Sequence, residues 1–234
     1  MSTAPSPPPT VEEIAHDRHS VRAFTRQEVD ASVIGDIIEV AQRAPSWCNV
    51  QPWTLDLLSG EAKNSLVDRM LADADRGPGQ YDIPAPSTYS GVYRDRRRAS
   101  GFRLYEAVGV DRADMSGRSA QARENFRFFG APHALIISCA SELLPYGLVD
   151  CGAFIATFQL AAQSKGVGTI AQAAVARYGA TIREFLGLSS EQRIVGALAF
   201  GYADTDHPVN SFRTERATVT DAVRCWRAAG RTPT

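Results

Sequence analysis

The sequence predicts one domain of the α+β class, and two kinds of pattern carry this prediction. Residues 134–139 and 194–202 are continuous apolar runs, with the length and composition of strands buried on both faces. Between and before them, apolar residues recur at helical spacing, and residues 146–165 form the longest such segment. A chain of 234 residues, 44% of them hydrophobic, can bury a full core in one domain. We expect a disordered arm at residues 1–9, which are rich in Ser and Pro, and a single domain over residues 10–234.

Composition excludes several classes of function. The formal net charge is −1, so no global basic field indicates nucleic acid or an anionic membrane as a partner. No apolar run reaches the roughly 18 residues of a membrane span. The four cysteines are far apart and lack metal-ligand spacing, so we expect neither a metal site nor disulfides. Reduced thiols in apolar surroundings predict a cytoplasmic protein.

The first elements follow from local signals. Thr10 and Glu13 have the spacing of a capping box, which predicts a short helix that ends before Arg18. A second helix is expected to begin near Asp30 and to end before Pro45. Residues 53–58 then predict a strand that turns Trp53, Leu55 and Leu57 inward.

The later helices are predicted in the same way. Residues after Ser59 form an amphipathic helix up to Gly77, and further helices are expected over residues 93–108 and 114–129. We interpret residues 146–165 as the core of a dimer interface, the alternative being the central helix of a monomer. A second capping-box pattern begins at Thr181, and Gly187 is expected to end that short helix.

The segment Arg18-His19-Ser20-Val21-Arg22 is the first candidate for chemistry. In an extended chain, Arg18, Ser20 and Arg22 lie on one side of the backbone, and His19 and Val21 on the other. Two guanidinium groups that flank a hydroxyl can bind a phosphate monoester, since each offers paired donors to phosphate oxygens. The alternative is a solvated basic connector.

The segment from Pro45 to Trp53 is the second candidate. Two prolines bracket a stretch that holds Asn49, Gln51 and two tryptophans, which is unusual for a merely connecting loop. Amide groups and backbone donors held in place by proline can bind a flat heteroaromatic ring, and indoles can cover it. The alternative is a buried loop whose tryptophans complete the core.

Together, the two segments resemble the FMN-binding front half of the nitroreductase family. The resemblance rests on Arg18-His19-Ser20-Val21-Arg22, followed after one helix by Pro45-Ser46-x-x-Asn49-x-Gln51-Pro52-Trp53, and it extends over about residues 11–216. It implies an α-β-α sandwich with a mostly antiparallel central sheet flanked by helices, in an intertwined homodimer. It also implies that residues 219–226 wrap onto the partner subunit.

The resemblance implies a set of cofactor-binding residues. The first motif would hold the phosphate and ribityl chain of FMN, and the second would reach the isoalloxazine of the neighbouring subunit. Residues 172–173 would pass beneath the reactive edge of the flavin, although some members carry Glu-Gly there. Residues 212–216 resemble a second phosphate-contacting segment. The implied residues are Arg18, His19, Ser20, Arg22, Pro45, Ser46, Trp47, Asn49, Gln172, Ala173 and Arg213.

The implied function is an FMN-dependent oxidoreductase. It would pass hydride from NADPH or NADH to nitroaromatic or quinone-like acceptors by a ping-pong mechanism, with no catalytic side chain because FMN carries the hydride. Trp47, where the family often has a small residue, would narrow the acceptor site. His19 is expected to hold the first motif, the alternative being a catalytic acid.

Other functions stay open at this point. The chain could be a non-reductive member of the same superfamily, either flavin-fragmenting or azoline-oxidising, or a flavin-binding sensor or storage protein without turnover. The basic residues 94–98 either meet nicotinamide dinucleotide phosphates or only keep the protein in solution. A Rossmann dehydrogenase is disfavoured, because the sequence has no G-x-G-x-x-G motif after a strand.

Overall fold

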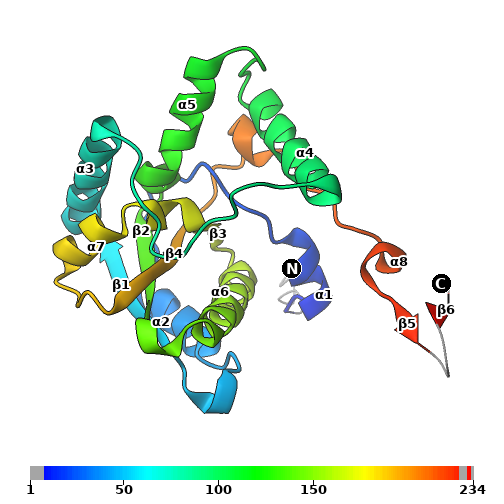
Figure 1. Ribbon diagram of the computed structural model, residues 1–234, viewed down its shortest axis with the longest axis horizontal. Helices are drawn as coiled ribbons and strands as arrows, with labels where there is room; N and C mark the ends of the chain where they lie inside the picture. The colour runs from blue at the N-terminus through cyan, green and yellow to red at the C-terminus, as the bar shows by residue number, and fades with distance from the viewer. Residues whose placement is uncertain (1–7, 227–230, 233–234) are drawn as a thin grey trace, which may run out of the picture.

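The computed structural model describes residues 8–226 and 231–232, so residues 1–7 of the predicted arm lie outside the described residues. Its centre is a four-stranded sheet in the order β1-β2-β4-β3 (Figure 1). The strands are β1 (Trp53–Ser59), β2 (His133–Ala140), β3 (Gly168–Gln172) and β4 (Gln192–Gly201), and each neighbouring pair is antiparallel. The predicted antiparallel sheet is therefore confirmed.

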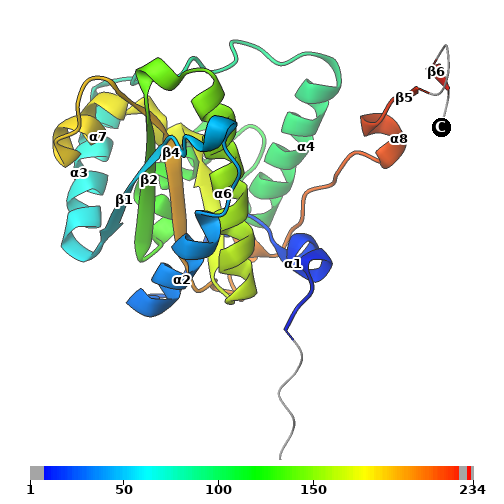
Figure 2. The ribbon, with the colours of Figure 1, turned by 90° about the horizontal axis from the view of Figure 1, so that it is seen from below.

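Helices cover both faces of this sheet (Figure 2). On one face lie α2 (Ala31–Ala41) and α6 (Tyr146–Ser164), and on the other lie α3 (Gly60–Arg76) and α7 (Gly179–Leu186). Strand β2 shows why its sequence is apolar without alternation. Leu135 and Ile137 pack toward α2 and α6, whereas Ala134 and Ile136 pack toward α3 and α7. The α-β-α sandwich is thus confirmed.

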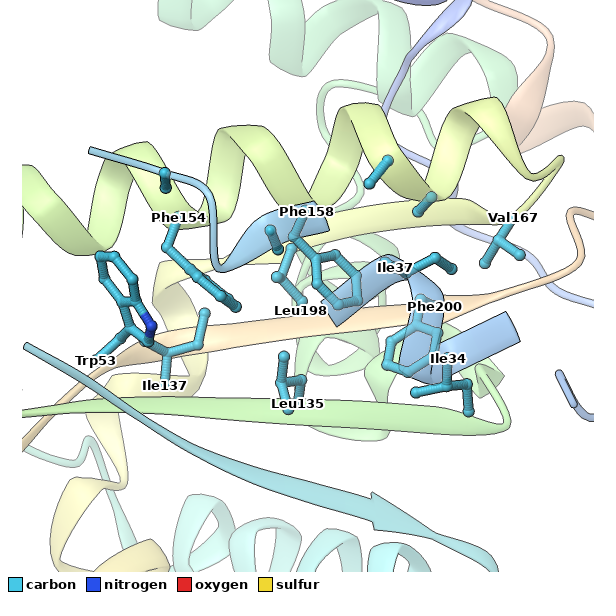
Figure 3. Packing of buried hydrophobic residues seen from close by; sticks show 14 of the residues in the cluster. Ile34, Ile37, Trp53, Leu135, Ile137, Phe154, Phe158, Val167, Leu198 and Phe200 are labelled. Atoms are coloured by element: carbon cyan, nitrogen blue, oxygen red, sulfur yellow. The ribbon is translucent and has the colours of Figure 1, made fainter. Parts of the chain in front are cut away.

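The core beneath α6 is aromatic (Figure 3). Phe154 and Phe158 of α6 are fully buried, and Phe158 meets Phe200 of β4 edge-on, with 5.4 Å between ring centroids. Trp53 packs on Phe154 at 5.1 Å. Burial of side chains of this size contributes about 1.5–3 kcal/mol each. The packing fixes α6 to the sheet and so defines the position of its N-terminus.

Several local predictions hold. Helix α1 (Val11–Asp17) begins at Thr10, with both hydrogen bonds of the capping box formed. Gly187 ends α7 in the left-handed conformation, at φ 66°. The remaining helices are α4 (Gly91–Ala107), α5 (Met115–Arg123) and α8 (Val219–Ala222). No helix within the described ranges combines the length and apolar character needed to cross a membrane.

Three local predictions were wrong. Leu57 is 45% exposed because β1 lies at the edge of the sheet, whereas Leu58, which packs on the α3 side, is 6% exposed. Helix α7 begins at Gly179 rather than at a Thr181 cap, since the Thr181 hydroxyl donates to Asp73 of α3 instead. The helix expected over residues 114–129 ends at Arg123, and a 3-10 segment, η2 (Glu124–Gly130), follows it.

The C-terminal segment stands away from the sandwich. Helix α8 and the short strands β5 (Cys225–Trp226) and β6 (Arg231–Thr232) lie apart from the sheet and its covering helices in Figure 1. Val219 and Val223 are 76% and 46% exposed there. These apolar side chains therefore have little contact with the rest of their own chain.

Candidate functional site

A cavity of about 210 Å³ lies where the N-terminal motif meets a segment close to the C-terminus. It brings together five of the residues predicted from the sequence: Arg18, His19, Ser20, Arg22 and Arg213. Among the described residues, no carboxylate lines it. The full lining is Ala15, His16, Arg18, His19, Ser20, Arg22, Phe212, Arg213, Thr214 and Arg216.

The electrostatics of this cavity favour an anion. Burial, and then the neighbouring Arg216, lower the pKa of Arg18, and burial lowers the pKa of Arg22. Both directions mean that the charged guanidinium is less favourable here than in water. A bound dianion would reverse this effect by supplying the missing opposite charge. The cavity therefore has the chemistry of a phosphate receptor.

His19 belongs to the same cavity, contrary to the strict alternation expected for residues 18–22. Val21 does turn inward, at 2% exposure, while His19 lines the cavity beside the arginines. The His19 Nδ1 donates to the Asp17 carbonyl at 3.0 Å. Burial lowers the pKa of His19; that hydrogen bond opposes the shift, and Arg213, Arg18 and Arg22 add to it. Without a bound anion, the cavity therefore favours the neutral imidazole over the charged form.

The first motif lies alongside β3. The Val21 N–H donates to the Thr169 carbonyl at 3.0 Å, and Ser20 pairs with Thr169 in a parallel bridge. Gln172 ends β3 three residues further along, at about 3.3 Å per residue. An extended ligand could therefore run from the arginine cavity along β3 to residues 172–173, about 10 Å away.

At that end of β3, the side chain of Gln172 points inward. It is 3% exposed, and its Nε2 donates to the Asn125 carbonyl at 2.8 Å. Its Oε1 is buried and has no hydrogen-bond partner among the described residues. Ala173 is exposed beside it. The surface offered here is thus backbone with a single methyl group, which a flat ring can approach closely.

The second motif lies apart from this cavity within one chain. Pro45, Trp47 and Asn49 are exposed, and none of them lines the arginine cavity. The Trp47 N–H is held by the carboxylate of Asp150 on α6, at 3.1 and 3.2 Å from its two oxygens. The Trp47 indole is 63% exposed and packs on Tyr146. Trp53 completes the core, as the alternative reading expected, but Trp47 does not.

The backbone of this loop is strained. Cys48, Asn49 and Gln51 have φ values of 49°, 56° and 50°, a region that non-glycine residues seldom occupy. The Gln51 N–H donates to the Ser46 hydroxyl at 2.9 Å, which closes the turn around η1 (Trp47–Asn49). Strain of this kind often accompanies functional loops. Here it presents Asn49 and Trp47 outward, away from their own domain.

Sequence reasoning missed two residues of the cavity region. Arg216 lines the cavity, although only Arg213 was chosen from residues 212–216. Asn210 is buried behind the cavity, where its side-chain oxygen accepts from the backbone N–H of Arg22 and its carbonyl accepts from the guanidinium of Arg213. Arg216 could have been included because it shares the segment. Asn210 has no local signal, since one of its partners, Arg22, lies 188 residues away in sequence.

Within residues 8–226 and 231–232, no group of three or more His, Cys, Asp or Glu side chains has the geometry of a metal site. All four cysteines carry free thiols, and burial is the main reason that the pKa of Cys151 is raised to about 12. Cys151 therefore does not supply a reactive thiolate near neutral pH.

Comparisons with known proteins agree on one family. The family model described as "Nitroreductase family" matches residues 15–202. The chain is 36% identical over 211 residues to a 4-nitrobenzoate reductase of Nocardioides sp. (strain LMS-CY), covering 88% of this chain and 85% of the relative. Its fold matches the FMN and NADPH-dependent nitroreductase NfnB of Sphigopyxis sp. strain HMH with a TM-score of 0.90, at 35% identity over 94% of this chain and 99% of that one.

A second solved structure is also similar over most of its length. The FMN-dependent nitroreductase NfnB of Mycobacterium smegmatis, solved in complex with NADPH, matches with a TM-score of 0.87 and 30% identity. The match covers 92% of this chain and 97% of that one.

Proposed function

We propose that this chain, which belongs to the nitroreductase family, is an FMN-dependent enzyme. It reduces nitroaromatic compounds with NADPH or NADH. One observation carries the proposal most directly. The arginine cavity is free of carboxylates among the described residues and adjoins the strand that ends at residues 172–173. The relative named 4-nitrobenzoate reductase supports the substrate class, and the solved structure named an FMN and NADPH-dependent nitroreductase supports the cofactors.

The donor set of the cavity fits the phosphate of FMN. Arg18, Arg22 and Arg213, with Arg216 beside them, offer paired N–H donors, and Ser20 adds a hydroxyl. This is a receptor for one phosphate monoester. The sequence has no glycine motif for an adenylate, so FMN is favoured over FAD.

When bound, FMN supplies the redox chemistry, taking hydride from the nicotinamide and giving it to the acceptor. The chain's own residues bind and orient. The arginines fix the phosphate end, and the backbone at Ala173 faces the ring end. The Nδ1 proton of His19 is engaged by the Asp17 carbonyl, so we assign His19 to holding the motif rather than to proton transfer.

We also propose a homodimer in which the second motif serves the partner's flavin. Four apolar side chains are exposed near the N-terminus of α6: Trp47 at 63%, Val50 at 48%, Tyr146 at 61% and Val149 at 69%. A second copy of the chain would cover this surface and bring Asn49 to the ring end of the other site. Residues 219–226 would lie against the same partner.

The free thiols and the use of reduced nicotinamide support a cytoplasmic location.

The function is tested by steady-state kinetics of the FMN-loaded protein. We expect oxidation of NADPH or NADH that depends on 4-nitrobenzoate or a quinone, with parallel double-reciprocal lines because both flat substrates use one face in turn. Arg22→Ala should lose FMN and activity together. A protein that binds FMN stoichiometrically but oxidises neither nicotinamide with any nitroaromatic would contradict the proposal. Intersecting lines would contradict the ping-pong order alone.

A further inference from the structure

Asn210 lies behind the arginine cavity, at the end of η5 (Pro208–Asn210), and is 6% exposed. Its side chain makes three hydrogen bonds. The Oδ1 accepts from the backbone N–H of Arg22 at 2.8 Å, and the Nδ2 donates to the backbone carbonyls of Ala23 and Asp204 at 2.9 and 2.8 Å. Both N–H groups and the oxygen of the amide are therefore hydrogen-bonded, as expected for a buried amide side chain.

The backbone of Asn210 holds the other half of the cavity. Its carbonyl accepts from Nη1 of Arg213 at 2.9 Å. One buried residue thus contacts the chain at Arg22, near the N-terminus, and the side chain of Arg213, near the C-terminus. Because these two arginines come from distant parts of the sequence, their separation across the cavity depends on what joins the segments.

A second contact secures the same segment from outside. Arg103 of α4 donates from Nη1 to the Arg213 carbonyl at 2.9 Å, and its Nη2 pairs with Glu215. Arg103 is partly exposed, and it does not line the cavity. It therefore acts on the position of the segment that carries Arg213 and Arg216, without reaching the phosphate itself.

We propose that Asn210, from inside, and Arg103, from outside, are positioning residues that set the spacing of the arginines for the phosphate of FMN. This rests on the proposed function. An amide is required at position 210, because one atom must accept from the Arg22 N–H while the other donates to two carbonyls. An aspartate would turn an oxygen toward the carbonyls of Ala23 and Asp204, and would add negative charge behind a phosphate site.

Binding of FMN and riboflavin to the apo-protein separates this role from general stability. Riboflavin has the same ring and ribityl chain but no phosphate. For Asn210→Ala and Asn210→Asp, we expect the Kd of FMN to rise by about tenfold or more, and that of riboflavin by less than about twofold, as measured by flavin fluorescence quenching. For Arg103→Met, on the surface, we expect about a threefold rise for FMN alone.

Two control variants match these changes. Ser211→Ala alters the adjacent residue of the same turn, and Arg69→Met removes a comparable surface arginine that pairs with Glu184 far from the cavity. Both should bind FMN as the wild type does. If Asn210→Ala does not fold, as judged by circular dichroism, Arg103→Met still decides the question.

The outcomes are distinct. Equal losses of FMN and riboflavin affinity, or unchanged FMN affinity in Asn210→Asp and Arg103→Met, would overturn the positioning role while leaving the proposed function intact. A wild-type protein that binds riboflavin and FMN equally would overturn the inference. Binding of neither flavin by the wild type would overturn both the inference and the proposed function.

Discussion

The arginine cavity and the loop from Pro45 to Gln51 carry the two halves of the sequence signature, yet they are built in opposite ways. The cavity is assembled within one chain, and Asn210 joins its two sides through a buried hydrogen-bond network. The loop holds three residues at positive φ and exposes its indole, with a single buried carboxylate, Asp150, holding it to α6. The cavity is lined by residues of one chain, whereas the loop turns Trp47 and Asn49 outward from its own domain.

This contrast says how a site can be divided between chains. Charged groups that must surround a phosphate need a fixed spacing, which a buried network provides. A loop that contacts a ring from the partner needs only to be stiff and to face outward, and two prolines with a strained backbone achieve this. A substitution in one of the two regions should therefore leave the other region unaffected.

The largest effect is expected in the cavity. Arg22→Ala removes a charged donor from the proposed phosphate site, where such a hydrogen bond contributes about 1.5–3 kcal/mol, so the Kd of FMN should rise by about 10- to 150-fold. Fluorescence titration of the apo-protein measures this, with Arg69→Met as the control. The proposed dimer should persist at the same concentration, because Arg22 lies away from the loop. An unchanged Kd would remove the cavity as the phosphate site.

A change in the loop region should instead affect association of the two subunits. Val149→Glu places a carboxylate on the exposed apolar surface beside Trp47 and Tyr146, which should dissociate the proposed dimer at micromolar concentration. Analytical ultracentrifugation checks the mass. The monomer should fold, since Val149 does not belong to the core. A Val149→Glu protein that stays dimeric would place the interface elsewhere.

A smaller effect is expected at the indole itself. Trp47→Ala removes a flat side chain without touching the arginine cavity, so flavin content should remain near that of the wild type. The ratio of kcat/KM between bulky and small nitroaromatics should shift by about 10-fold toward the bulky ones, because indole removal widens the site. Trp53→Phe, in the core, serves as a control for general loss of tryptophan. Loss of flavin in Trp47→Ala, with unchanged acceptor preference, would contradict a shape role.

The sequence allowed much of this contrast to be predicted. Residues 18–22 and the two buried strands have strong local signals, because guanidinium pairs and continuous apolar runs are unusual in sequence. Two predictions, the inward direction of Leu57 and the helix cap at Thr181, were wrong for the same reason. Edge position in the sheet and a hydrogen bond to α3 are tertiary facts that local patterns do not encode. Asn210 was missed because its role exists only when distant segments meet.

The smallest effect concerns pH. Burial lowers the pKa of His19 in the apo-protein, so the unfolded chain binds a proton more readily than the folded one. This contribution to stability is present above the unfolded pKa of about 6.5 and is lost as the pH falls through the lower folded value. Thermal unfolding of apo-protein between pH 7.5 and 5 should therefore show a shallower decline in Tm for His19→Gln than for the wild type. A steeper decline in Tm for His19→Gln than for the wild type would contradict a lowered pKa of His19 in the folded protein.

The claim that each site draws its phosphate ligands from one chain and its loop from the other is tested most directly with mixed dimers. Arg22→Ala and Asn49→Ala chains, carrying different tags, are co-expressed, and the mixed dimer is titrated with FMN. If the site is shared, one site of the mixed dimer holds both defects and the other holds none, so half of the sites should bind FMN with wild-type affinity. If both residues served the same site, each site would hold one defect. No site of wild-type affinity would then be found, and the account would be contradicted.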